Sequence, residues 1–180
     1  MKLILDAGHG GSDPGAIYNG YNEKDITIAI VNILAQKLVE QIPNLEVVLT
    51  RTADETVTPG ERRRLCMHIN PRAMISIHCN AFADPRANGS EVVYREDDDK
   101  VLAGYIQASV ITDLGLKNRG LIHDLNDLKR RLALMSTPGI PSVIVEPGFI
   151  SNTSDLTVLC DHTRVAQAIA AGVVKWAAQL

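Results

Sequence analysis

Apolar residues along the chain fall into two patterns, short continuous runs and longer stretches with an apolar residue at every third or fourth position. The short runs are typical of strands, and the periodic stretches are typical of helices that bury one face. Five runs predict strands, at residues 2–6, 45–50, 73–78, 90–95 and 142–146. Periodicity and end signals predict helices, at residues 25–42, 59–69, 97–114, 154–160 and 163–178.

Local signals place several of the helix ends. Thr58 and Glu61 form a helix-start signature, with a capping hydroxyl, a carboxylate three residues later and a proline in the first turn between them. Three consecutive aspartates supply negative charge at the start of the third helix, and Gly115 ends it. Ser154 is the expected cap of the brief fourth helix.

The alternation of strands and helices predicts a single three-layer α/β/α domain over residues 1–180. Its central sheet is expected to be mainly parallel or mixed and to have about six strands. The mixed region 119–136 is expected to contribute short strands at 121–123 and 132–135, with the charged stretch Asp127–Arg131 as a loop or turn between them. In such folds ligands bind where strands end and loops begin.

Composition excludes several classes of protein. The 180 residues are 46% hydrophobic and 22% charged, which is typical of one globular domain and not of a disordered, fibrous or membrane-inserted chain. The net charge of −3 gives no basic excess, so we expect no nucleic-acid partner. Three cysteines without close pairing favour a reducing compartment, and the first residues lack the pattern of a signal peptide. We therefore expect the chain to be made in the cytoplasm. We also expect it to be a monomer.

Four chemically capable side chains stand at or just after the ends of predicted strands. His9 follows the first strand in a glycine-rich loop, Arg51 follows the second, His78 ends the third, and Glu146 ends the strand at 142–146. Because parallel strands end at the same edge of a sheet, we expect these side chains to converge there.

Each candidate also has a structural interpretation. His9 is equally compatible with a turn, His78 with a hydrogen-bonded core residue, and Glu23 with a charge that complements a helix dipole. Glu146 is harder to explain structurally, because a carboxylate at the end of an apolar strand is costly to bury without a partner. Cys79 is interpreted as a small buried hydrophobe, since neighbours in a strand point to opposite faces.

The candidate set contains the residue types of a hydrolytic zinc site. Two histidines and a carboxylate would hold the ion with one position left for water, and a further carboxylate would act as general base. The long spacings match no local zinc motif, so residue types alone leave this assignment open. A Ser-His-Asp hydrolase is disfavoured because the G-x-S-x-G elbow is absent.

Five sequence blocks carry a resemblance to a known family. They are Leu-Asp-Ala-Gly-His-Gly-Gly-Ser-Asp-Pro-Gly-Ala at 5–16, Asn-Glu-Lys-Asp at 22–25, Leu-Thr-Arg at 49–51, Ser-Ile-His-Cys-Asn-Ala at 76–81 and Val-Glu-Pro-Gly-Phe-Ile-Ser-Asn at 145–152. In this order they resemble the zinc-dependent N-acetylmuramoyl-L-alanine amidases of the amidase-3 type, over nearly the whole chain.

The resemblance implies a reaction and a role for four residues. His9, Glu23 and His78 would bind one zinc ion with an open water position, and Glu146 would be the catalytic carboxylate. The reaction would be hydrolysis of the amide bond between N-acetylmuramic acid and L-alanine in peptidoglycan, with the stem peptide and the glycan strand as partners. The chain would then be a catalytic domain of an endolysin or autolysin, without a separate wall-binding domain. It would act on the cell wall after release or export by another route.

Three further residues carry smaller expectations. Asp6 is expected to orient a zinc-bound imidazole. For Arg51 and Asn80, a structural role and contact with the substrate both remain open, and the structural role is preferred.

Other functions remain compatible with the residues alone. A zinc exopeptidase-like amidohydrolase could use the same metal set on short peptides or amino-acid amides. A non-catalytic wall-binding module would not need two histidines and two glutamates near strand ends. A structural domain with hydrogen-bonded core histidines would bind no zinc.

Overall fold

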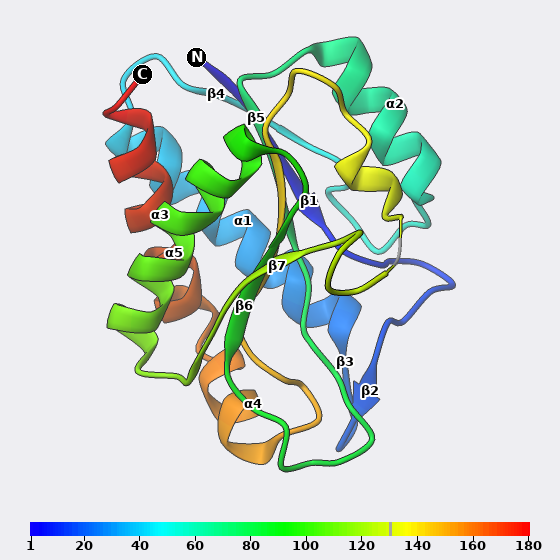
Figure 1. Cartoon of the computed structure of the whole chain (residues 1–180). Helices are drawn as coiled ribbons and strands as arrows, with labels where there is room; N and C mark the ends of the chain where they lie inside the picture. Colours follow the sequence, from blue (N-terminus) through cyan, green and yellow to red (C-terminus); the bar gives the residue numbers. More distant parts are fainter. Residues whose placement is uncertain (130) are drawn as a thin grey trace.

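A six-stranded sheet with the order β4-β1-β5-β8-β6-β7 forms the centre of the computed structural model, which describes residues 1–129 and 131–180 (Figure 1). Strands β4, β1, β5 and β8 are parallel, whereas β6 pairs antiparallel with β8 and parallel with β7. This mixed, mostly parallel sheet confirms the expected fold class. The strands are β1 (Lys2–Ala7), β4 (Glu46–Leu49), β5 (Ala73–Ile77), β6 (Ser90–Tyr94), β7 (Asn118–His123) and β8 (Ser142–Glu146).

Helices cover both faces of the sheet and complete the three layers. Helices α1, α3 and α5 lie together on one face, while α2 and the short 3-10 helix η1 (Ala133–Met135) cover the other (Figure 1). Helix α2 spans the predicted residues, and Thr58 and Glu61 form the expected capping box. The helices are α1 (Glu23–Gln41), α2 (Pro59–Ile69), α3 (Asp97–Leu114), α4 (Thr153–Leu159) and α5 (His162–Ala177).

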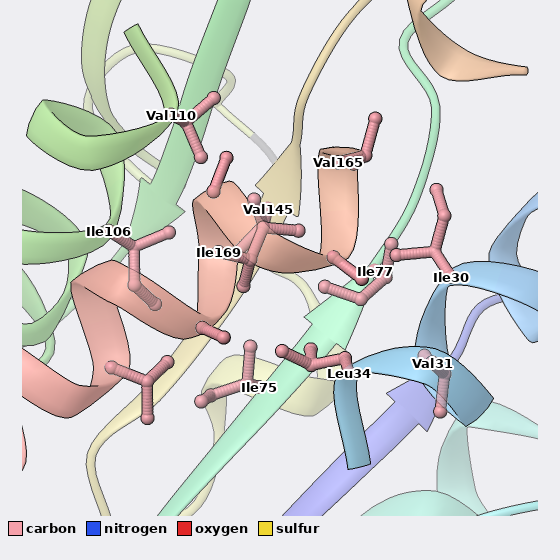
Figure 2. Close-up of a cluster of buried hydrophobic side chains, with 14 of the residues drawn as sticks. Ile30, Val31, Leu34, Ile75, Ile77, Ile106, Val110, Val145, Val165 and Ile169 are labelled. Carbon is pink, nitrogen blue, oxygen red and sulfur yellow. The ribbon is translucent and has the colours of Figure 1, made fainter. Parts of the chain in front are cut away.

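Strand side chains divide between two cores because neighbouring residues point to opposite faces. Figure 2 shows the larger core, where Ile75 and Ile77 of β5 and Val145 of β8 lie among Leu34 of α1 and Ile169 of α5. The smaller core, beneath α2 and η1, contains Ile4, Cys66, Met74, Val93, Leu134, Met135, Ile140 and Ile144.

No helix in the described part of the chain is both long and apolar enough to cross a membrane.

The region between the sixth and eighth strands differs from its prediction. Residues 132–135 do not form a strand. Residues 133–135 form the single turn η1 instead, and this turn buries Leu134 and Met135 against the smaller core. Strand β7 does form, although it begins earlier than predicted. The described part of the expected Asp127–Arg131 loop has no helix or strand, and residue 130 lies outside the described residues.

Two local features also differ from the prediction. The segment before α1, where no strand was predicted, contains a small hairpin of β2 (Ile17–Tyr18) and β3 (Tyr21–Asn22). Helix α4 is capped by Asn152 and not by Ser154, because the Asn152 side chain accepts hydrogen bonds from the backbone N–H groups of Ser154 and Asp155. The helix therefore begins one residue earlier than predicted.

Candidate metal centre

Three of the sequence-predicted residues meet at one edge of the sheet. His9 lies just after β1, His78 follows β5 directly, and Glu23 is the first residue of α1. One nitrogen or oxygen atom from each lies within 4.8 Å of the others. The structure thus brings the predicted set together from three separate elements.

The Glu23 carboxylate lies between the two imidazole rings. Its Oε2 is 3.0 Å from Nε2 of His9, and its Oε1 is 3.0 Å from Nδ1 of His78. The backbone N–H of Cys79 donates to Oε1 at 2.8 Å, and that of Ala16 donates to Oε2 at 3.0 Å. Only 3% of Glu23 is exposed, so these four contacts fix the carboxylate in a single orientation.

Opposite charges in this cluster shift the pKa values of its members. Burial would raise the pKa of the Glu23 carboxyl, but hydrogen bonds and charge from His78 and His9 outweigh burial and hold that pKa well below its usual range. Burial lowers the pKa of His9, but hydrogen bonds and charges from Glu23 and Asp13 reverse this effect and raise it. Glu23 is therefore ionised, as a metal-binding carboxylate must be.

The backbone approaches the ligands at two glycines. His9 itself adopts a left-handed conformation, with φ of 61°, which non-glycine residues rarely adopt. A Cβ atom at Gly8 would lie 2.5 Å from Cε1 of His78, and one at Gly15 would lie 2.7 Å from Oε2 of Glu23. Side chains at either position would push a ligand out of place, which explains the glycine-rich loop.

Asp13 belongs to the site, although the sequence reasoning missed it. Its Oδ2 is 2.8 Å from Nδ1 of His9, and its Oδ1 accepts a hydrogen bond from the backbone N–H of Gly15. The carboxylate holds the ring so that Nε2 is directed at Glu23, as is usual for histidines that bind metals. The only signal in the sequence was an acid four residues after the histidine.

The expectation that Asp6 orients a metal-binding imidazole is wrong. Among the described residues, its carboxylate accepts hydrogen bonds from the Arg62 guanidinium and from the hydroxyls of Thr50 and Ser76, the latter two at 2.5 Å. Strand alternation directs Asp6 toward the face covered by α2, where Arg62 reaches it.

Two buried arginines instead hold the backbone that carries His9. Arg51 donates to the carbonyl oxygens of Ala7 and Gly8, at 3.0 and 3.1 Å. Arg62 donates to the carbonyl oxygens of Ala7 and His9, both at 2.6 Å. The structural role expected of Arg51 agrees with these contacts, and Arg62 links the buried Asp6 to the His9 loop.

Replacing Arg62 by methionine is expected to lower the free energy of unfolding by about 3–5 kcal/mol, because it leaves the Asp6 carboxylate buried without its partner. Urea denaturation of the metal-free protein measures this change in the free energy of unfolding. The matched control is R64M, at an exposed position of the same helix, for which a change within about 0.5 kcal/mol is expected. Equal stability of the two variants would contradict the role given to the Asp6–Arg62 pair.

Glu146 lies beside this cluster and faces a second carboxylate. Ile77 pairs with Val145, so His78 and Glu146 occupy neighbouring positions where β5 and β8 end. Across the antiparallel pair, Glu146 is opposite Glu91 of β6. Sequence reasoning missed Glu91, although a carboxylate within an otherwise mainly apolar strand was a signal.

One hollow is lined by two of the candidate ligands, and a second hollow is lined by none of them. A recess of about 190 Å³ is lined by His9 and His78 and by apolar side chains that include Leu134 and Ile144. A second hollow lies between the β2–β3 hairpin and the segment after β5, where Ile17 and Phe82 are 62% and 64% exposed.

The donor set fits zinc. Two imidazole nitrogens and one carboxylate oxygen are typical protein ligands of catalytic zinc, which keeps a further position for water or substrate. Here these donors converge within 4.8 Å, and hydrogen bonds hold two of them, His9 and Glu23, in place.

Comparison with known sequences and structures agrees with this geometry. Residues 3–175 match the family model Amidase_3, described as N-acetylmuramoyl-L-alanine amidase. The uncharacterised protein YqiI of Bacillus subtilis is 32% identical over 95% of this chain and 82% of its own length. The probable cell wall amidase LytH of Staphylococcus saprophyticus is 31% identical over 95% of this chain, but the chain spans only 56% of that protein.

A solved structure has the same fold over nearly its full length. The catalytic domain of CwlV, an N-acetylmuramoyl-L-alanine amidase from Bacillus (Paenibacillus) polymyxa var. colistinus, superimposes with a TM-score of 0.89. The two chains are 28% identical, and the match covers 98% of each.

Proposed function

The chain belongs to the Amidase_3 family of N-acetylmuramoyl-L-alanine amidases, and on that premise we propose that residues 1–180 act as a zinc-dependent catalytic domain on peptidoglycan. Family membership makes the chain a hydrolase of amide bonds. The observation that carries the proposal is the convergence of His9, Glu23 and His78 beside a strand that ends in Glu146.

The bond that would be cleaved joins the lactyl group of N-acetylmuramic acid to the amine of L-alanine. The oxygen of one water molecule bonds to the amide carbon, and the carbon–nitrogen bond breaks. The products are a carboxylate on the glycan strand and a stem peptide with a free amino terminus. Peptidoglycan is therefore the proposed macromolecular partner, and the cell wall is the proposed place of action.

The residues of the chain would divide this work. His9, Glu23 and His78 would hold zinc, which as a Lewis acid polarises the amide carbonyl and acidifies water. Asp13 and the backbone N–H of Cys79 keep two of these ligands oriented. Glu146 would accept a proton from the attacking water and donate it to the departing L-alanine amine.

Digestion of purified peptidoglycan, with and without a chelator, tests the proposal. We expect free L-alanine amino groups to appear with the untreated enzyme, to disappear with chelator and to return when zinc is added back. Release of single amino acids from short peptides, with the muramoyl bond left intact, would instead support the exopeptidase alternative. Binding to the wall that survives chelation without any hydrolysis would support a wall-binding module.

A further inference from the structure

The hollow between the β2–β3 hairpin and the segment after β5 takes no part in the reaction proposed above (Figure 1). Resting on that proposed function, we propose that this hollow binds the glycan strand of peptidoglycan, on the sugar side of the cleaved amide bond. The hollow, here called the hairpin hollow, has a volume of about 450 Å³. Its main lining residues are Ile17, Tyr18, Ala81, Phe82, Pro85 and Ser151.

The hairpin hollow begins one residue away from a contact of the candidate ligand cluster. The backbone N–H of Ala16 donates to Oε2 of Glu23 at 3.0 Å, and Ile17 is the next residue. On the other side of the hollow, Phe82 follows His78 by four residues. N-acetylmuramic acid is joined to the amide by a short lactyl ether, so its ring must lie close to the cleaved bond. The hollow is therefore within reach of the first sugar.

Two large apolar side chains are exposed in this hollow and stand on a fixed backbone. Ile17 and Phe82 are each more than half exposed. The backbone N–H of Phe82 donates to the hydroxyl oxygen of Ser151 at 3.0 Å, and Ile17 pairs with Asn22 within the hairpin. Exposed apolar side chains that are held in place in this way are typical of an interaction site, because little ordering is needed when a ligand covers them.

The charge of the hairpin hollow favours the glycan over the stem peptide. All of the described side chains that line it are uncharged. Two charged residues of the same segment, Asp84 and Arg86, pair with each other at 2.6 Å. The glycan is neutral where its lactyl carboxyl is tied into the amide, whereas the stem peptide carries free carboxylates. An uncharged surface therefore matches the sugars and offers no cation to the peptide.

The lining also has the chemistry that a sugar ring requires. The faces of a β-linked N-acetylated ring present C–H bonds, and the acetamido group adds a methyl, so the ring of Phe82 and the aliphatic Ile17 can cover them. Ser151 is only 9% exposed, and in the described part of the chain its hydroxyl donates to no acceptor. This hydroxyl can donate to a sugar hydroxyl or an acetamido oxygen. Apolar walls with a single polar group that sets orientation are usual in ligand sites.

Replacing Phe82 by alanine tests the glycan site with two substrates that share one stem peptide. The first carries the peptide on a tetrasaccharide of alternating N-acetylglucosamine and N-acetylmuramic acid, and the second carries it on D-lactate without any sugar. F82A is expected to lower kcat/KM on the first substrate about tenfold, through a higher KM with kcat unchanged, because the lost contact is made to a part that does not react. On the second substrate F82A is expected to match the wild type.

Two further variants complete this experiment. I17A, a second truncation in the hollow, is expected to act in the same direction as F82A, and both should retain the zinc content of the wild type. The control is V101A, which removes exposed apolar surface from α3 and should match the wild type on both substrates.

Three results of this experiment would overturn the proposal. Wild-type kcat/KM for F82A and I17A on the tetrasaccharide substrate would show that the hollow binds no glycan. Equal losses on the two substrates would assign the hollow to the stem peptide. A dimer in analytical ultracentrifugation that F82A abolishes would assign it to a second copy of the chain.

Binding of chitotetraose separates this proposal from the proposed function. This neutral oligomer of N-acetylglucosamine has no muramoyl amide, so its binding does not depend on hydrolysis. In NMR titrations of the zinc-loaded protein, we expect the Ile17 methyl and Phe82 ring signals to shift, and we expect F82A to bind about tenfold more weakly than V101A. Unshifted signals overturn the glycan site, whereas shifted signals in a protein that cleaves no muramoyl amide overturn only the proposed reaction.

Discussion

Replacing Glu146 by glutamine is expected to lower kcat on peptidoglycan by about 10²–10⁴-fold, the usual contribution of a general acid–base residue. Glutamine keeps the size of the side chain but cannot accept the proton of the attacking water. Glu146 is not among the three converging donors, so E146Q is expected to retain its full zinc content. Turnover and metal content should be measured on the same preparation.

The control for this variant is E40Q, at an exposed position of α1. It makes the same chemical change far from the strand ends and should leave kcat unchanged. Hydrolysis by E146Q at the rate of E40Q would remove Glu146 from the proposed reaction. Loss of zinc together with activity would show that Glu146 acts on the metal site and not as a base.

Glu146 also makes the stability of the metal-free protein depend on pH. Burial and the facing Glu91 raise its pKa from the ordinary 4.5 to about 8, so the folded chain binds this proton more tightly than the unfolded chain. The resulting stabilisation is complete below the unfolded pKa and is lost as pH rises through the folded pKa. As the pH rises from the unfolded pKa to the folded pKa of Glu146, the melting temperature of E146Q is expected to rise relative to that of the wild type. A constant difference would contradict the raised pKa.

Replacing His78 by alanine is expected to abolish both zinc binding at stoichiometric metal and peptidoglycan hydrolysis. The substitution leaves only His9 and Glu23 as donors, and it removes the ring that holds one oxygen of Glu23. Zinc at 100 times its dissociation constant should stabilise the wild type by about 2.7 kcal/mol. That gain should be absent in H78A, as measured by thermal unfolding with and without zinc.

H68A is the matched control, because His68 is exposed on α2 and outside the ligand cluster. It should bind zinc, gain stability from it and cleave peptidoglycan like the wild type. Full metal loading of H78A, with the same gain in melting temperature, would contradict the ligand role of His78.

Much of this architecture could be predicted because local signals and burial agree. The start of helix α2 is encoded locally, by the capping hydroxyl of Thr58 and the carboxylate of Glu61, and the helix forms where predicted. The convergence of His9 and His78 follows from parallel strands that end at one edge of the sheet. Glu23 needed the family resemblance, because an acid at a helix start has a sufficient local explanation.

The errors arise where tertiary contacts outweigh local pattern. Asp6 was predicted to lie near the histidines because it is close to His9 in sequence. Strand alternation instead directs its side chain to the face of the sheet covered by α2, where it accepts hydrogen bonds from Arg62 and Ser76. Glu91 was missed because its importance depends on pairing with a strand far along the chain, in a direction that periodicity does not reveal. The β2–β3 hairpin has only two residues in each strand, which is too few for any period to be seen.

The boundary between β5 and β8 divides the site into two halves that are built by different strands. The candidate metal ligands lie on or next to β1, α1 and β5, whereas Glu146 ends β8 and the facing Glu91 belongs to β6. Substitutions in β6 can therefore change the surroundings of Glu146 without replacing a candidate metal ligand, so the two halves of the site can be altered in separate experiments.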